Sequence, residues 1–210
     1  CHDCHPGTVA ADGTIDVAGG KHIDGELEVD YSSMTCSSCH GGVENAAPPI
    51  GTRGETETTE AAVGAHQKHV ASAAWHRDGQ CADCHAVPQS VSHSDEKTDF
   101  EWGLVSKADG ASPAYDSGTH TCATTYCHGT TLKGANVGGK VNRTPEWTKV
   151  DGTYNECGTT CHTLPPGAGH APAPTGCNCH GSVVTSVNVG PPATATWKNK
   201  DLHINGQVNY

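Results

Sequence analysis

The stretch Cys81-Ala82-Asp83-Cys84-His85 sets two thiols three positions apart and places an imidazole directly after the second thiol. Five further stretches of the 210-residue chain also end in Cys-His, and the six together account for all 12 cysteines. Two of the five keep the two-residue spacing, whereas the other three separate their cysteines by four, three and one residues. The six pairs are Cys1 and Cys4, Cys36 and Cys39, Cys81 and Cys84, Cys122 and Cys127, Cys157 and Cys161, and Cys177 and Cys179.

A Cys-x-x-Cys-His stretch is the attachment signature of c-type haem, in which two thiols add to the vinyl groups of one porphyrin and the next imidazole reaches the iron. Zinc sites and disulfides are the alternatives. Zinc takes four ligands without requiring His after every second Cys, and cysteines one or two residues apart bond to each other poorly. We therefore expect six covalent haems, with all twelve cysteines attached. The expected proximal iron ligands are His5, His40, His85, His128, His162 and His180.

The chain is too poor in apolar residues to build an ordinary core. Leu, Ile, Val and Phe number 27, about 13% of the chain, whereas folded domains usually exceed about 20%. The 26 Gly and 12 Pro residues further disfavour long helices and strands. We therefore expect a mostly irregular, loop-rich multihaem cytochrome c, with few short helices and strands around a core of stacked haems. Residues 1–210 should form one continuous hexahaem array.

Charge and hydropathy exclude several classes of partner. The formal net charge is −11, whereas nucleic-acid binding requires a basic surface. No run approaches the roughly 18 apolar residues of a membrane span. No signal peptide precedes Cys1, so we expect a processed or trimmed chain.

Nine histidines remain once each iron has its proximal ligand, and the chain has a single methionine. Six irons therefore require mainly bis-histidine ligation, which gives lower reduction potentials than histidine–methionine ligation. His66 and His69 lie three residues apart in an Ala-rich stretch, residues 59–75, that favours a helix, so they should share one face. The alternative for this pair is a solvated helix face.

A repeated turn supplies two further candidates for distal ligands. Residues 21–27 resemble residues 202–208, because each stretch contains His-Ile, then Asp or Asn, then Gly. Each turn is expected to lead into a short strand. His93 precedes Phe100 and Trp102, which could cover a haem face, and His170 lies between the fifth and sixth Cys pairs. The expected distal ligands are His22, His66, His69, His93, His170 and His203. His2, His76 and His120 are expected at the surface, with His76 and His120 as the alternative ligands.

With these motifs together, the chain resembles the secreted multihaem cytochromes of metal-reducing bacteria, whose domains combine CxxCH with CxxxxCH motifs. It departs from their pattern in the three-residue spacing after Cys157 and the one-residue spacing after Cys177. The initial segment, residues 1–35, looks like a second copy of the closing segment, residues 177–210. The resemblance rests on residues 36–41, 64–69, 81–88, 126–129, 145–147, 164–166 and the His-Ile-Asn-Gly turn at 203–206.

The expected function is electron transfer between closely packed haems, without enzymatic activity of its own. The resemblance implies an extracellular respiratory role, with a periplasmic location as the alternative. Expected partners are other redox proteins or extracellular electron acceptors, and further copies of the chain joined head to tail into a filament. A soluble electron shuttle and a multihaem reductase of a small oxyanion are the alternative functions. A reductase needs an open iron, often marked by Lys in place of the motif His, and no Cys-x-x-Cys-Lys occurs.

Overall fold

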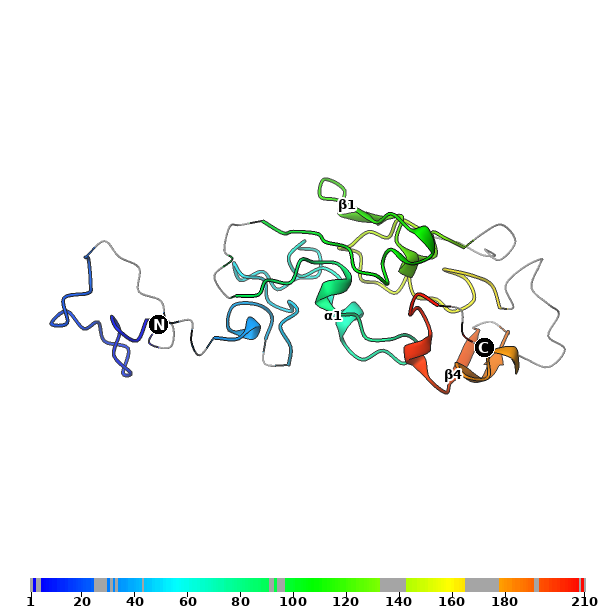
Figure 1. Ribbon diagram of the computed structural model, residues 1–210, viewed down its shortest axis with the longest axis horizontal. Coiled ribbons are helices and arrows are strands. Elements are labelled where there is room, and N and C mark those ends of the chain that lie inside the picture. The colour runs from blue at the N-terminus through cyan, green and yellow to red at the C-terminus, as the bar shows by residue number, and fades with distance from the viewer. Residues whose placement is uncertain are drawn as a thin grey trace.

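The computed structural model describes residues 2, 5–24, 30, 32, 34–42, 44–90, 93, 97–132, 143–164, 178–190, 193–207 and 209. Over these residues the chain is loop-rich, as predicted, and its helices and strands are short (Figure 1). The α-helix α1 spans His66–Val70, and the strands are β1 (Ala114–Asp116), β2 (Thr121–Ala123), β3 (Val184–Asn188) and β4 (Thr194–Trp197). Single 3-10 turns lie at Cys36–Ser38, Cys81–Asp83, Ala108–Gly110, Tyr126–His128, Asn178–His180 and Lys200–Leu202.

The strands form two separate antiparallel hairpins. In the first hairpin Tyr115 pairs with Cys122, so one cysteine of the fourth Cys pair belongs to β2. In the second hairpin Val184 pairs with Trp197, and the register shifts between Val184 and Ser186. Two-stranded hairpins have little independent stability, so each depends on what packs against it.

The helix that the sequence predicts over residues 59–75 is much shorter in the structure. Residues 57–65 form successive turns, and α1 begins only at His66. Gly64 has a φ of +41°, outside the right-handed helical region, so the helix cannot extend through it. At the other end Ala71 is extended, with φ −68° and ψ 146°. The predicted extent was therefore wrong, although both histidines of the stretch do lie on the helix.

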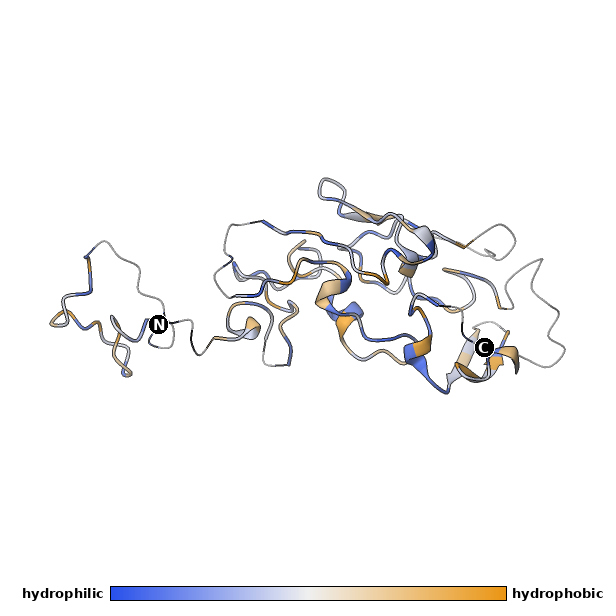
Figure 2. Cartoon of the chain, in the orientation of Figure 1, coloured by the Kyte–Doolittle hydropathy of each residue, from blue (hydrophilic) through white to orange (hydrophobic). Residues whose placement is uncertain are grey.

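The protein's own side chains make only a small core. Among the described residues the buried hydrophobic side chains are Ala47, Val63 and Val183. Figure 2 shows apolar segments scattered along the chain instead of gathered at its centre. The accessible surface is 13,153 Å², whereas a compact protein of 21.6 kDa exposes about 9,200 Å². The polypeptide therefore exposes about 4,000 Å² more than a compact fold of its mass.

The two similar terminal segments share a strained turn. Ile23 and Ile204, which follow His22 and His203, have φ values of +71° and +62°. A β-branched residue rarely adopts positive φ, so the surroundings of the turn must impose this geometry. The two copies differ in exposure: Ile23 is 89% exposed and belongs to the N-terminal segment that lies apart from the body in Figure 1, whereas Ile204 is half-buried. The strand expected after the first turn lies outside the described residues.

No helix in the described ranges is long and apolar enough to cross a membrane.

Candidate functional site

Three pairs of imidazole rings face one another at nearly the same separation. The ring centroids lie 5.9 Å apart for His40 and His93, 6.2 Å for His66 and His85, and 6.0 Å for His69 and His128. Each pair joins a histidine that directly follows a Cys pair to one that does not. The structure therefore brings together three of the predicted proximal ligands with three of the predicted distal ligands.

The common separation matches two axial ligands of one metal ion. A metal–nitrogen bond of about 2.0 Å, and about 1.1 Å from that nitrogen to its ring centroid, place opposed imidazole centroids about 6.2 Å apart. Aromatic rings in ordinary contact also lie about 4.5–7 Å apart, so distance alone does not distinguish the two cases. Every His–His ring contact among the described residues joins one motif histidine to one non-motif histidine.

Main-chain carbonyl groups fix the tautomer of the non-motif histidines. Nδ1 of His66 donates to Val63 O, Nδ1 of His69 to Ala65 O and Nδ1 of His93 to Ser90 O, each at 2.9 Å. A carbonyl oxygen only accepts, so the proton must be on Nδ1 and Nε2 keeps its lone pair. Metal-ligating histidines typically have this arrangement, because the second hydrogen bond orients the ring.

Burial keeps the imidazoles of His66, His69 and His128 neutral. It lowers the pKa of His66 to about 4 and that of His128 to about 3, and it also lowers the pKa of His69. Neighbouring histidines lower these pKa values further, whereas the carbonyl partners of His66 and His69 raise theirs. A neutral imidazole is the form that binds a metal ion, so the sites are ready for one at neutral pH.

A metal ion held by one of these histidine pairs would need its remaining ligands from a group other than protein side chains. Among the described residues no group of three or more His, Cys, Asp or Glu side chains could hold a metal ion. A protein zinc site needs four ligands, of which these pairs supply two. A porphyrin iron needs two axial ligands, because the macrocycle supplies the other four donors. The donor set of each pair fits a haem iron and does not fit zinc.

The cysteines lie in tight turns beside their histidines. His40 N donates to Cys36 O at 3.0 Å, and His85 N donates to Cys81 O at 2.8 Å, so each of these Cys-x-x-Cys-His stretches folds as one turn. None of the nine cysteines within the described residues forms a disulfide. Cys1, Cys4 and Cys177 lie outside the described residues.

Burial raises the pKa of the cysteine thiols. The pKa is about 12 for Cys84 and about 11 for Cys122 and Cys127. These thiols are therefore protonated at neutral pH, which disfavours a role as free thiolate nucleophiles. Cys122 and Cys127 themselves contribute to the raised pKa of Cys84, so the third and fourth Cys pairs lie close together.

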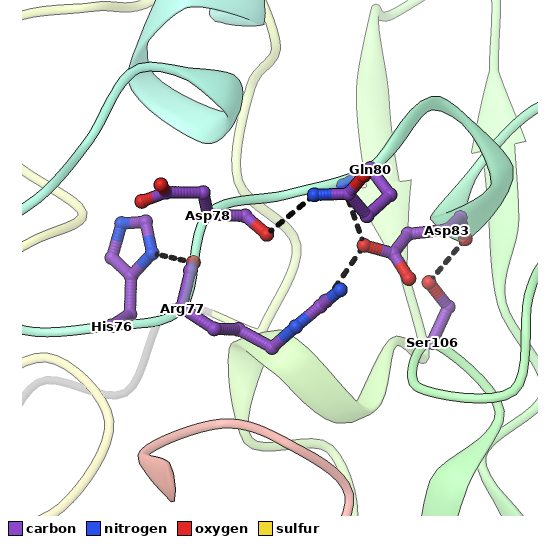
Figure 3. Close-up of polar contacts among 6 residues, drawn as sticks. All are labelled: His76, Arg77, Asp78, Gln80, Asp83 and Ser106. Atoms are coloured by element: carbon purple, nitrogen blue, oxygen red, sulfur yellow. Dashed lines mark hydrogen bonds and ion pairs between the residues drawn. The ribbon is translucent and has the colours of Figure 1, made fainter. Parts of the chain in front are cut away.

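Hydrogen bonds join these two Cys pairs through Ser106, which is 2% exposed. Its Oγ donates to Asp83 O at 2.5 Å, and its own carbonyl accepts from Tyr126 N at 3.0 Å. The Asp83 carboxylate accepts from Gln80 N at 2.8 Å and pairs with Arg77 at 2.7 Å (Figure 3). This network fixes the spacing between two neighbouring attachment stretches.

The remaining predicted ligands are less completely placed. Nδ1 of His203 donates to Trp75 O at 2.6 Å, and burial lowers the pKa of His203 to about 4. Nδ1 of His180 donates to Asn209 O at 2.6 Å, and Nδ1 of His162 donates to Thr163 O at 2.9 Å.

At the N-terminal end, His5 is half-buried, whereas His22 is exposed and makes no ring contact with another described residue. The prediction for His170 falls outside the described residues.

Two tryptophans near the histidines escaped the sequence reasoning. Trp147 lies 4.7 Å from His66 and 5.6 Å from His69, and its Nε1 donates to Ala61 O at 2.8 Å. Trp75 lies 4.4 Å from His76 and 5.8 Å from His203. Trp75 could have been noticed from its adjacency to His76, whereas Trp147 lies 86 residues from Ala61 and no local pattern connects them.

No family model matches this chain, and no curated protein or solved structure matches it.

Proposed function

We propose that the chain is an electron carrier that binds six c-type haems covalently, each with two axial histidines. The observation that supports this most directly is the set of three imidazole pairs at 5.9–6.2 Å, each joining a Cys-His motif to a second histidine. The haem, when bound, supplies one-electron chemistry at its iron. The chain supplies two thiols for attachment, two neutral imidazoles and hydrogen bonds that hold the attachment turns at a fixed spacing.

The exposed surface of the chain also supports this proposal. A large aromatic side chain buries about 150–250 Å², and a porphyrin is several times larger. Six such groups would cover surface on the order of the roughly 4,000 Å² by which the chain exceeds a compact fold. The shortage of apolar side chains and the small core then have one explanation, because the cofactors supply the apolar mass.

Intact mass spectrometry of protein matured in a c-type cytochrome host tests the proposal. We expect the mass to exceed that of the polypeptide by six haems, all retained under denaturing conditions. The double variant Cys81→Ala/Cys84→Ala is the matched control and should carry five. Chains that carry zinc or internal disulfides and no haem would refute the proposal.

Carbon monoxide binding separates the carrier from a reductase. Irons with two axial histidines are closed, so the reduced wild-type protein should not bind carbon monoxide. Binding of one carbon monoxide per reduced wild-type chain would indicate an iron with an open coordination position and would favour a reductase of a small oxyanion.

For partners, we propose head-to-tail contact between copies of the chain in an extracytoplasmic, respiratory setting. The exposed N-terminal turn supports this, because the 89% exposed Ile23 after His22 has a positive φ like that of the half-buried Ile204 after His203. A strained turn with an exposed apolar side chain favours a partner surface. Light scattering and electron microscopy of the haem-loaded protein should show fibres. A monodisperse monomer at high concentration would leave a soluble shuttle as the function.

A further inference from the structure

Two tryptophans in the structure have similar surroundings. Trp147 meets His66 edge-on, at an interplanar angle of 89°, and His69 at 30°. Trp75 meets His76 edge-on, at 86°, and His203 at 58°. In the first trio two of the predicted distal histidines contact one indole. In the second trio His76 occupies the place that His66 has in the first.

His76 also has the tautomer of the paired histidines. Its Nδ1 donates to Arg77 O at 2.5 Å, so Nε2 keeps its lone pair. In Figure 3 the second ring nitrogen of His76 lies on the side of the Asp78 carboxylate, whose pKa His76 helps to lower, whereas the Arg77 side chain runs in the other direction, to Asp83. His76 is half-buried, which contradicts the expectation that it is a surface residue.

The loop that carries His76 is tied down on two sides. Arg77 pairs with Asp83 at 2.7 Å, which joins the loop to the third Cys pair. Lys200 pairs with Asp78 at 2.5 Å and donates to Ser72 Oγ at 3.0 Å, which joins it to the closing segment. An imidazole on a backbone fixed in this way loses little further freedom when it binds a metal ion.

The neighbours of His76 are other imidazoles of the candidate sites. His76 contributes to the lowered pKa values of His69, His128 and His203, so it lies within electrostatic reach of all three. His162 also lowers the pKa of His203, so the predicted proximal ligand of the fifth Cys pair lies near the same histidines. The proximal histidines of the second, third and fourth Cys pairs already face partners.

We propose that His76 is an axial haem ligand, opposite the proximal histidine of the fifth or sixth Cys pair, His162 or His180. The inference rests on the proposed haem function. It raises the number of distal candidates to seven for six irons; among the described candidates, the ring contacts of His76 and His203 are with tryptophans, whereas the exposed His22 has no ring contact with another described residue.

The variant His76→Ala tests the assignment in haem-loaded protein. We expect one of six irons to become high-spin in electron paramagnetic resonance, one carbon monoxide to bind per reduced chain, and added imidazole to restore the low-spin state. His120→Ala is the matched control, because His120 is also half-buried but its Nδ1 faces the hydroxyl of Tyr115 at 3.1 Å. That variant should keep all six irons low-spin.

An all-low-spin His76→Ala protein that carries six haems and binds no carbon monoxide would overturn the inference and leave the proposed function intact. A wild-type chain without haem would instead overturn the proposed function. If the alanine variant does not fold, His76→Met keeps a ligand at the position. It should stay low-spin and raise the reduction potential of one haem, because thioether ligation raises potentials. Six unchanged potentials in that variant would also refute the assignment.

Discussion

Replacing Gly64 by alanine should displace Trp147 from His66 and His69, the two histidines of α1. Gly64 has a φ of +41°, and a Cβ at this position would overlap the indole of Trp147. The indole would have to leave, breaking its hydrogen bond to Ala61 O and its contacts with His66 and His69. The backbone strain costs about 1 kcal/mol, the lost hydrogen bond about 1 kcal/mol and the displaced ring about 2 kcal/mol. Together these predict a loss of about 4 kcal/mol in the free energy of unfolding.

Gly54→Ala is a close control for this experiment. Gly54 has a φ of +89°, but no atom lies within 4 Å of the Cβ that alanine would add. Its cost should therefore be backbone strain alone, about 1 kcal/mol. Guanidinium unfolding of the two haem-loaded variants, followed by visible absorbance, measures the difference. Equal losses in the two variants would refute the argument that Trp147 depends on Gly64.

Three further predictions concern protonation, an ion pair and reduction potentials. The folded-state pKa values of His66 and His203, about 4, and of His128, about 3, lie below the usual 6.5, so the unfolded chain binds more protons than the folded chain in mild acid. The free energy of unfolding should be constant above about pH 6.5 and fall as the pH drops toward about 4. Denaturation midpoints measured across this pH range test the prediction. Midpoints that do not change with pH would contradict the burial of these rings. Asp83→Asn should lower the free energy of unfolding by about 1 kcal/mol, because it removes the charge that faces Arg77. Asp151→Asn is the control: Asp151 forms an exposed ion pair with Lys149 at 3.7 Å, and its loss should leave the denaturation midpoint unchanged. An iron held by His40 and the exposed His93 should have a lower reduction potential than an iron held by the half-buried His69 and His128, because solvent stabilises the charged oxidised state. Redox titration of His93→Met and of His69→Met identifies the two irons, because each substitution shifts one reduction potential upward. The reverse order of the two potentials would refute the argument.

Local patterns in the sequence predict much of the candidate site. Covalent attachment requires adjacent residues, so the Cys-His stretches can be recognised one by one. Three of the predicted proximal ligands lie against three of the predicted distal ligands, although which would meet which was not predicted. The loop-rich fold also follows from composition. The extent of the helix was not predicted, because it is limited by the positive φ of Gly64 and the extended backbone of Ala71, which the Ala-rich composition of the stretch does not reveal.

The proposed role of His76 illustrates why distal ligands resist prediction from sequence. A distal histidine has no fixed neighbour in the chain, and what prepares it for a metal ion is a carbonyl oxygen facing its Nδ1. The carbonyl lies three residues before His66, four residues before His69 and one residue after His76. For His203 it belongs to Trp75, 128 residues earlier in the chain. Carbonyl groups occur at every position, so no residue type marks the partner. Only the folded backbone decides which imidazoles have a bare Nε2, and this is why a histidine that sequence reasoning placed at the surface has the tautomer and the indole contact of the paired ones.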